Sequence, residues 1–447
     1  MTAAHPYRTL WRLPGAPVLM VFGLVARLGI SMTPLGLLLL IQQATGRYAP
    51  AALAGGVYLL SSAAVAPLVG RVADRVGPAR VLLVTATVHP FGLAALVLAA
   101  EHRSVPGLGA AAAFAGSTYP PLVAVLRGVW SALTEPGGTT GPLRSTALAT
   151  DTSLYQLVFV AGPLLVAAIT AVGSPHLVLG ASAVVTVVGT VTLARGRAVR
   201  AWRPPLPAAR TTGAGPLRVA GFPALLSCVA GLGVAFGAIT VALPAYATRH
   251  GSDSGALAGV LFAVLSAGSA VGGFWFGAGA GVRRAPLRRQ FTVLLAAVAF
   301  GYTVIGMMPN PTAMIVALFF GGAMVAPALT VENALVGQMT PAGMRNEAYT
   351  WVVTVEVAAS SVTVPVAGVL VDQPGGVPWA FLVAGTAVAV AAAVSGLVDL
   401  ISGGVRRPGG RGRRGARTPA PAGPGQRPAT PASGRRPDPG PPPPARR

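Results

Sequence analysis

The stretch GRVADRVGPARVLL at positions 70–83 decides how the rest of the chain is interpreted. It lies between two apolar runs, at 51–70 and 80–100, and each run has about the 20 residues that a helix needs to cross a bilayer. Its four charged side chains are Arg71, Asp74, Arg75 and Arg80. Because short basic loops between membrane helices favour the cytoplasmic surface, the stretch predicts a tight cytoplasmic turn between two membrane-spanning helices.

The composition of the whole chain agrees with that interpretation. Of the 447 residues, 53% are hydrophobic and 10% are charged, whereas about 25% of the residues in a soluble domain are charged. The mean hydropathy is +0.66. The first apolar run starts near Val18 and is long enough to span, without the cleavage pattern of a signal peptide. The sequence therefore predicts an all-α membrane protein that crosses the bilayer many times.

The sequence also excludes several classes of function. Every basic residue is Arg, so the chain has no P-loop lysine for driving transport with ATP. Cys228 is the single cysteine, which excludes an internal disulfide, and no Cys/His spacing suits a metal ion. The five His residues are scattered and form no Ser/His or Cys/His pattern. We therefore expect no enzyme activity, no cofactor and no metal site.

Twelve apolar runs predict twelve membrane spans. They lie near 17–41, 51–70, 80–100, 106–132, 146–171, 175–194, 219–247, 255–281, 290–308, 312–337, 347–371 and 377–401. The termini and even-numbered loops hold 28 of the 33 Arg residues, and the odd-numbered loops hold three, Arg47, Arg103 and Arg249. Because basic residues favour the cytoplasmic side, we expect both termini in the cytoplasm and a multi-pass protein of the inner (plasma) membrane.

The predicted spans fall into two groups of six. The segments expected are a cytoplasmic N-terminus at 1–16, a six-helix bundle at 17–194, a basic linker at 195–218, a second bundle at 219–401 and a tail at 402–447. The tail is rich in Arg and Pro and has few large apolar side chains, so we expect it to be disordered in the cytoplasm. The positive charge is concentrated in the tail and the cytoplasmic loops, so it indicates topology before it indicates binding of nucleic acid. The alternative to a solvated tail is a weak attraction to anionic lipid headgroups.

The turn at 70–83 resembles the signature loop of the major facilitator superfamily, G-x-x-x-D-R-x-G-x-x-R. The matching residues are Gly70, Asp74, Arg75, Gly77 and Arg80. The position between spans 2 and 3 also matches, and the resemblance covers about residues 17–401. It implies two six-helix bundles that rock around a central site.

The resemblance also implies a role for the acid of this loop. In the family, the acid sits near the N-terminus of the eleventh span, where the helix dipole favours a carboxylate. Asp74 would therefore hold the cytoplasmic side closed in the outward-facing state. Gly70 would allow a close helix approach, and Gly77 would take a positive φ. The alternative is a basic loop that only sets topology and carries an incidental Asp.

Two further segments resemble family signatures in part. Arg127 in LVAVLRGVW is similar to the Arg of the fourth-span signature, with Trp130 and Ser131 where Gln and Gly are usual. Gly162 and Pro163 in VFVAGPLLVAA are similar to the core of the antiporter signature, a helix-packing motif, without its flanking glycines. The chain also resembles actinobacterial-type drug or metabolite efflux members of the family.

Five ionisable residues inside the predicted spans form the candidate proton or substrate site. They are Arg27, Arg127, Asp151, Glu332 and Glu356. Each would cost about 2.5–3.5 kcal/mol at the bilayer centre, so each needs a partner or a function. Arg127 and Asp151 lie at a similar distance from the cytoplasmic ends of spans 4 and 5, which predicts an ion pair. That pair would either lock the first bundle or relay protons.

Glu332 and Glu356 allow two interpretations. They would bind protons or substrate, or they would be hydrogen-bonded to neighbours such as Asn333, Ser360 or Ser361.

These features predict a secondary active transporter that moves a small organic compound by alternating access, with proton-coupled efflux as the main hypothesis. The alternative is an importer of a nutrient or organic anion, because Arg27 near mid-depth suits an anion. A second alternative is a membrane sensor or interaction protein that does not transport. The expected partners are a small-molecule substrate, protons and the lipid bilayer, with no nucleic acid, and the expected state is a monomer.

Overall fold

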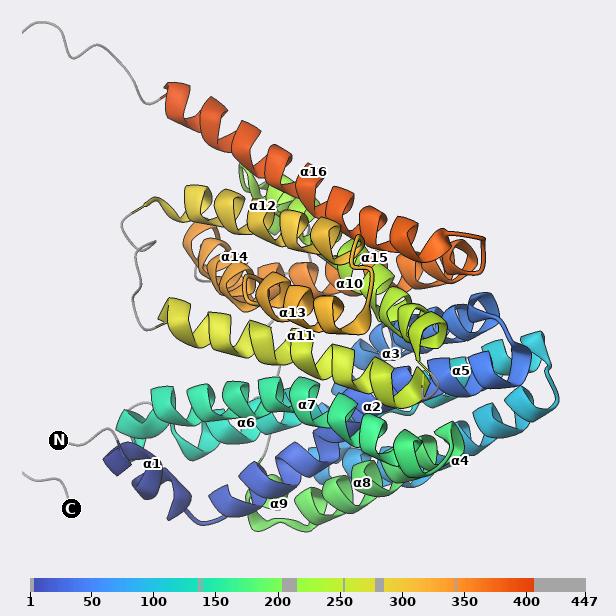
Figure 1. The fold of residues 1–447 in the computed structure, drawn as a ribbon. Coiled ribbons are helices and arrows are strands. Elements are labelled where there is room, and N and C mark those ends of the chain that lie inside the picture. The colour runs from blue at the N-terminus through green and yellow to red at the C-terminus, as the bar shows by residue number, and fades with distance from the viewer. Residues whose placement is uncertain are drawn as a thin grey trace, which may run out of the picture. The chain divides into compact units, whose positions relative to one another are not determined.

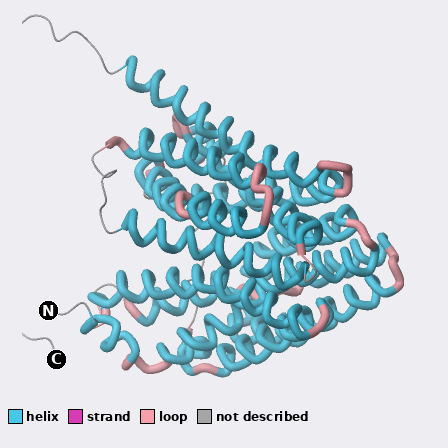
Figure 2. The backbone as a smooth tube through the Cα atoms, in the orientation of Figure 1, coloured by secondary structure: helices cyan, strands magenta, loops and turns pink. Residues whose placement is uncertain are grey.

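The computed structural model describes residues 4–135, 138, 140–202, 215–251, 254–277, 285–341 and 344–405. Every regular element in these segments is a helix (Figures 1 and 2). The chain divides into a unit of residues 1–402 and a unit of residues 403–447. The helices discussed below belong to the first unit. The predicted tail falls almost wholly outside the described residues, as does residue range 203–214 of the predicted linker.

Each predicted span corresponds to one long helix or to a pair of shorter ones. The long helices are α2 (Ala16–Thr45), α3 (Tyr48–Val76), α4 (Pro78–Glu101), α7 (Arg144–Val172), α8 (Pro175–Arg195), α10 (Phe222–His250), α11 (Ser254–Gly277), α12 (Leu287–Ile305), α15 (Arg345–Val371) and α16 (Gly376–Val405). The pairs are α5 (Val105–Ser117) with α6 (Leu122–Leu133), and α13 (Pro311–Gly322) with α14 (Val325–Met339). The remaining elements are α1 (Ala4–Trp11), α9 (Arg197–Ala201) and the 3-10 helices η1 (Gly141–Leu143) and η2 (Pro216–Arg218).

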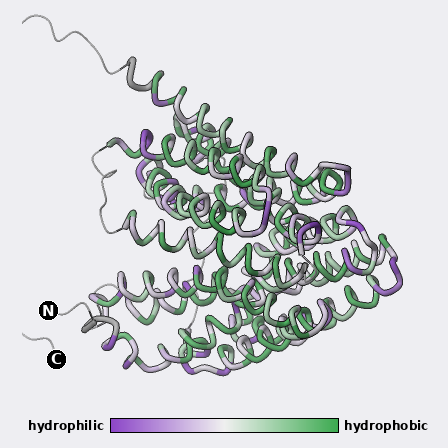
Figure 3. The backbone as a smooth tube through the Cα atoms, viewed as in Figure 1, coloured by the Kyte–Doolittle hydropathy of each residue, from purple (hydrophilic) through white to green (hydrophobic). Residues whose placement is uncertain are grey.

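Eleven of these helices or pairs are long and apolar enough to cross a membrane, counted over the described residues. The one predicted span outside the eleven is α12, which carries Arg288 and Arg289 near its start. Figure 3 shows hydrophobic residues along the lengths of the helices and the most hydrophilic residues at turns and helix ends. The structure therefore shows a multi-pass membrane protein, and the twelfth span remains a prediction.

Spans 4 and 10 are each broken into two helices, a feature that the count of apolar runs in the sequence did not predict. Between α5 and α6 the chain reads Thr118-Tyr119-Pro120-Pro121, and proline removes an N–H and disfavours a helix in the residue before it. Ala323 and Met324 separate α13 from α14, directly after Gly321 and Gly322. The fourth span is thus interrupted in each group of six.

We call α2–α8 the N-half and α10–α16 the C-half. We call the end of the bundle that carries α9 and η2 the linker end, and the opposite end, with the α2–α3 and α15–α16 turns, the distal end. Gly15 at the start of α2 lies against Ala198 of α9, and Gly215 beside η2 lies against Met344 at the start of α15. Helices α2, α10 and α15 therefore begin at the linker end, and α3 and α11 begin at the distal end.

Glycine brings neighbouring helices close together within the N-half. A Cβ added to Gly189 of α8 would lie 2.6 Å from the Cα of Ala26 on α2, and one added to Gly29 would collide with Thr186. Small residues are the usual means of close packing between helices in membranes. The approach of α8 to α2 at this level fixes the helix that carries Arg27.

This packing makes a first prediction. Gly189→Ala is expected to lower the free energy of unfolding by about 1–3 kcal/mol, the usual effect of added volume in a filled core. Gly180→Ala on the same helix is the control, because nothing lies within 4 Å of the Cβ it would add. Thermal unfolding in detergent compares the two variants with the parent, and equal transition temperatures for both would contradict the prediction.

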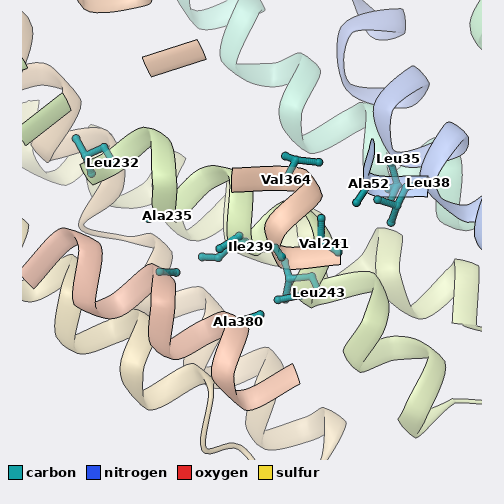
Figure 4. Packing of buried hydrophobic residues seen from close by; sticks show 14 of the residues in the cluster. Leu35, Leu38, Ala52, Leu232, Ala235, Ile239, Val241, Leu243, Val364 and Ala380 are labelled. Carbon is teal, nitrogen blue, oxygen red and sulfur yellow. The ribbon is translucent and has the colours of Figure 1, made fainter. Parts of the chain in front are cut away.

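The buried apolar side chains form two clusters. The larger includes residues of both halves, among them Leu35 and Ala52 from the N-half and Leu243, Val364 and Ala380 from the C-half, and Figure 4 shows part of it. The smaller cluster comes from α1, the N-half and α9, and among the described residues it includes none from the C-half; its largest member is Trp130 of α6. The halves therefore share a core in one region and have separate cores in another.

The halves meet mainly through two helix pairs, α3 with α15 and α7 with α11, and α10 makes smaller contacts with α2 and α3. Helix α3 is mostly buried from Tyr48 to Tyr58 and mostly exposed from Leu60 to Val72. Helix α15 shows the same contrast in the opposite chain direction, with its buried residues concentrated from Ser361 onwards. Contact between the halves is thus concentrated at the distal end (Figure 1).

Candidate functional site

A buried ion pair joins α2 to α7 inside the N-half. Arg27 Nη1 donates to Asp151 Oδ1 at 2.8 Å, and Nη2 donates to Oδ2 at 3.3 Å. The two side chains are 1% and 7% exposed. The Arg27 guanidinium also lies 5.6 Å from the ring centre of Tyr155, one turn after Asp151 on α7. The two-pronged contact with the carboxylate removes most of the charge that α2 would otherwise bring into the membrane.

The predicted pairing of Asp151 with Arg127 was wrong. Arg127 is exposed on α6, and no ion pair between it and an acid is recorded in the part of the chain that the structure describes. Helix α6 buries the face with Leu126 and Trp130, and this face turns Arg127 away from the packed interior. Equal depth places two residues at one level, but the packing of α2 against α7 decides which of them meet.

The break in span 4 contributes to the surroundings of Arg27. The hydroxyl of Tyr119 donates to the carbonyl of Ala26 at 3.4 Å, so this residue of the break lies against α2 beside Arg27. The ring of Tyr119 meets that of His89 edge-on at 5.2 Å, and His89 Nδ1 is 3.0 Å from the carbonyl of Ala115. Tyr119 and Tyr155 were not identified from the sequence as site residues, and the proline pair after Tyr119 was the available signal.

Two carboxyl groups lie in the C-half. Glu332 of α14 is 2% exposed, and its Oε2 has no hydrogen-bond partner among the described residues. Glu356 of α15 is half-buried and lies near enough to Glu332 for their charges to interact. Helix α10 approaches α15 at this level, where a Cβ on Gly233 would lie 3.1 Å from the Cα of Glu356. The structure thus places the two acids together on α14 and α15.

The predicted polar neighbours do not satisfy these acids. The Asn333 amide donates to the carbonyl of Leu329 at 2.7 Å, and the hydroxyl of Ser361 has no partner in the described segments. No hydrogen bond from either Glu to Ser360 is recorded among those residues. The interpretation of Glu332 as a hydrogen-bonded structural acid therefore finds no support in its contacts.

The signature turn joins α3 to α4. Gly77 has φ 95°, the positive value predicted for it. A Cβ added to Gly70 would have open space within 4 Å, so the close approach predicted there is absent in this conformation. Arg75 and Arg80 are exposed, and the side chain of Asp74 lies outside the described part of the chain.

Gly162 and Pro163 lie where α7 contacts two helices. Gly162 faces Ser31 of α2, with the added Cβ 3.0 Å from the Ser31 Cβ. The carbonyl of Pro163 lies against Gly259 of α11, which belongs to the other half. This short segment therefore supports both the packing of the N-half and the contact between halves.

The fold and family of the chain are known from comparison with other proteins. The family model for the Major Facilitator Superfamily matches residues 19–312, well over half of the chain. No curated protein sequence matched it.

Solved transporter structures share the fold. A crystal structure of the peptide transporter POT with sulfate has a TM-score of 0.66 at 14% identity and covers 90% of this chain and 98% of its own. The nucleoside transporter NupG gives 0.66 at 14%, covering 85% and 99%. A bacterial homologue of the iron transporter ferroportin gives 0.63 at 16%, covering 86% and 98%. With its apolar helices, this chain is a multi-pass membrane transporter, not an enzyme, and it belongs to the Major Facilitator Superfamily.

Proposed function

We propose that the protein is a proton-coupled secondary transporter that exports a small organic compound across the inner (plasma) membrane. It has twelve spans, of which α12 is the ninth, and it works as a monomer by alternating access. The linker end and both termini face the cytoplasm. The basic loops predicted on that side support this orientation.

The observation that carries proton coupling is the environment of Glu332. An ionised carboxylate that is 2% exposed, with an oxygen that has no hydrogen-bond partner among the described residues, is costly inside a membrane protein. Binding a proton removes that cost, and a conformation that admits water to the carboxyl group allows it to ionise again. A group whose charge is favourable in one state and unfavourable in the other couples proton binding to the switch between them. Glu356, beside it on α15, is the second acid of this site.

The contacts of Arg27 narrow the substrate class. The alternative of importing an organic anion rested on Arg27, but its guanidinium is buried and already holds Asp151 by two hydrogen bonds. An anion would have to displace Asp151 to bind there. The acids of the C-half remain for recognition, and they favour a neutral or cationic compound.

The arrangement of the halves supports alternating access. They are in contact at the distal end, and the linker-end portions of α3 and α15 are exposed. We infer that these exposed portions face a cavity open to the cytoplasm. The breaks in spans 4 and 10 lie at corresponding positions of the two halves, as interrupted helices do around transporter binding sites.

The proposed direction of transport, export, rests on the Gly162–Pro163 segment. This segment resembles the antiporter signature and contacts α11 of the other half. An exporter that exchanges its substrate for protons should dissipate an acid-inside gradient when substrate is added outside. A symporter should instead acidify the lumen when the acid is outside.

Proteoliposomes with a trapped pH dye test the proposal. We would impose each gradient in turn and add panels of cationic, neutral and anionic compounds, with parent protein beside Asp74→Asn. The expected result is a cationic or neutral compound that dissipates the acid-inside gradient only with the parent protein. Response only to the acid-outside gradient would make it an importer. Silence across all panels with folded parent protein would favour the non-transporting alternative.

A further inference from the structure

The distal contact between the halves contains a carboxylate from one half bound to a helix N-terminus of the other. Asp372 follows the last residue of α15, and its Oδ1 accepts the N–H of Tyr48 at 2.8 Å. Its Oδ2 accepts the N–H of Ala49 at 2.9 Å and lies 3.6 Å from Nε of Arg47. Tyr48 and Ala49 are the first two residues of α3. The positive end of that helix is thus bound by an acid from the opposite half.

The residue that precedes α3 does not cap the first turn of the helix. Arg47 is the residue before α3, and its side chain makes no capping hydrogen bond. The first N–H groups of a helix have no partner within the helix and need one from elsewhere. Asp372 supplies it, with a side chain that is 13% exposed. The carboxylate therefore satisfies two N–H groups that have no acceptor within their own helix.

Helix α10 reinforces the same contact from the C-half. Arg249, in its last turn, donates from Nη2 to the carbonyl of Val371 at 2.9 Å and to that of Gln373 at 3.3 Å. These carbonyls flank Asp372, so Arg249 holds the end of α15 that presents the acid. The hydroxyls of Tyr48 and Thr248 lie 2.5 Å apart and join α3 directly to α10.

The other ends of the same two helices lie at the linker end. Helix α15 starts at the linker end, and Met344 before it offers no side-chain cap. Helix α3 ends there and carries Asp74 in its last turn. The two helices run in opposite directions, and in the sequence each has an acid at or just past its C-terminal end.

We propose that Asp372 is the gating residue of the distal end, which holds the halves together there while the linker end is open. When the transporter switches, the Asp372 contact with α3 breaks, and a contact between Asp74 and the N-terminus of α15 forms at the linker end. The proposal rests on the alternating access proposed above and assigns Asp372 a positioning role in it. It makes the two acids alternate, one bound in each state.

Spin-label distances test this without substrate or a proton gradient. In a Cys228→Ser background, one pair of labels at His102→Cys and Met307→Cys reports on the distal end. A second pair at Arg195→Cys and Arg289→Cys reports on the linker end. All four positions are exposed. Double electron–electron resonance then gives the distance distribution at each end for the parent and for Asp372→Asn.

Asp372→Asn is expected to add a longer distance at the distal end and a shorter one at the linker end. Glu101→Gln is the matched control, because it removes a carboxylate at the distal end whose partner, His176 at 3.8 Å, belongs to the same half. Its distributions should match those of the parent. Superimposable distributions for Asp372→Asn and the parent at both ends would overturn the proposal.

A second variant covers the case in which Asp372→Asn does not fold. Arg47 is 67% exposed, so Arg47→Gln leaves the fold intact and removes only the cation beside Asp372. It should shift both distributions in the same directions by a smaller amount, and no shift would contradict the gating role. Shifted distances in a protein that moves no protons would retain the gate and reject proton coupling, so the two failures are distinguishable.

Discussion

Asp151→Ala is expected to lower the free energy of unfolding by about 3–5 kcal/mol, the usual effect of removing one partner of a buried ion pair. The variant leaves the Arg27 guanidinium, which is 1% exposed, without the carboxylate that holds it. Arg27→Leu should be destabilising for the reciprocal reason. The double variant should lose clearly less than the sum of the two, because neither charge is then left alone.

A double-mutant cycle measured by thermal unfolding in detergent tests this coupling. The control cycle combines Asp151→Ala with Arg127→Leu, the pairing that equal depth along the spans had predicted. From the structure we expect the losses in the free energy of unfolding to be coupled for Asp151 with Arg27 and additive for Asp151 with Arg127. Additive losses with Arg27, or coupling with Arg127, would contradict the contact that the structure shows.

Glu332→Gln is expected to abolish proton movement and leave substrate exchange. The amide has nearly the same shape as the protonated carboxyl, so it mimics the neutral form but cannot release a proton. In proteoliposomes without a gradient, exchange of labelled for unlabelled substrate should continue at the parental rate. With the gradient imposed, the pH dye should report no more than empty liposomes do.

Two variants make this result specific to Glu332. Glu135→Gln removes an exposed acid between α6 and η1 and should leave coupling intact. Glu356→Gln tests the neighbouring acid of the proposed site. If Glu332→Gln keeps the parental proton flux and Glu356→Gln loses it, the coupled proton binds to Glu356 on α15 and not to Glu332.

Much of the fold was accessible from the sequence because each span buries one continuous apolar run. Run lengths placed every predicted span on a helix or helix pair, and the short basic turn at 70–83 indicated the superfamily before any coordinates. The positive φ of Gly77 also followed from its place in that turn. These features depend on residues close together in the chain, and such patterns are what a single sequence displays.

The site was less accessible, because it depends on which helices are neighbours. Arg27 and Asp151 are far apart in the chain, and only the packing of α2 on α7 brings them together. Asp372 gave no sequence signal beyond an acid after an apolar run, since its partners are N–H groups that every helix start offers. The Pro120–Pro121 pair did signal a break, but its consequence for Tyr119 needed the position of α2.

The seam between the halves is lined by very small residues. A Cβ on Gly56 of α3 would lie 2.7 Å from the carbonyl oxygen of Ser361, and one on Gly259 of α11 would lie 2.7 Å from the Cβ of Ala167. Backbones set the fit at these two points, so no large side chain has to move there when the helices separate. Backbone contacts of this kind would allow the halves to separate and to meet again in the same register during the alternating access proposed above.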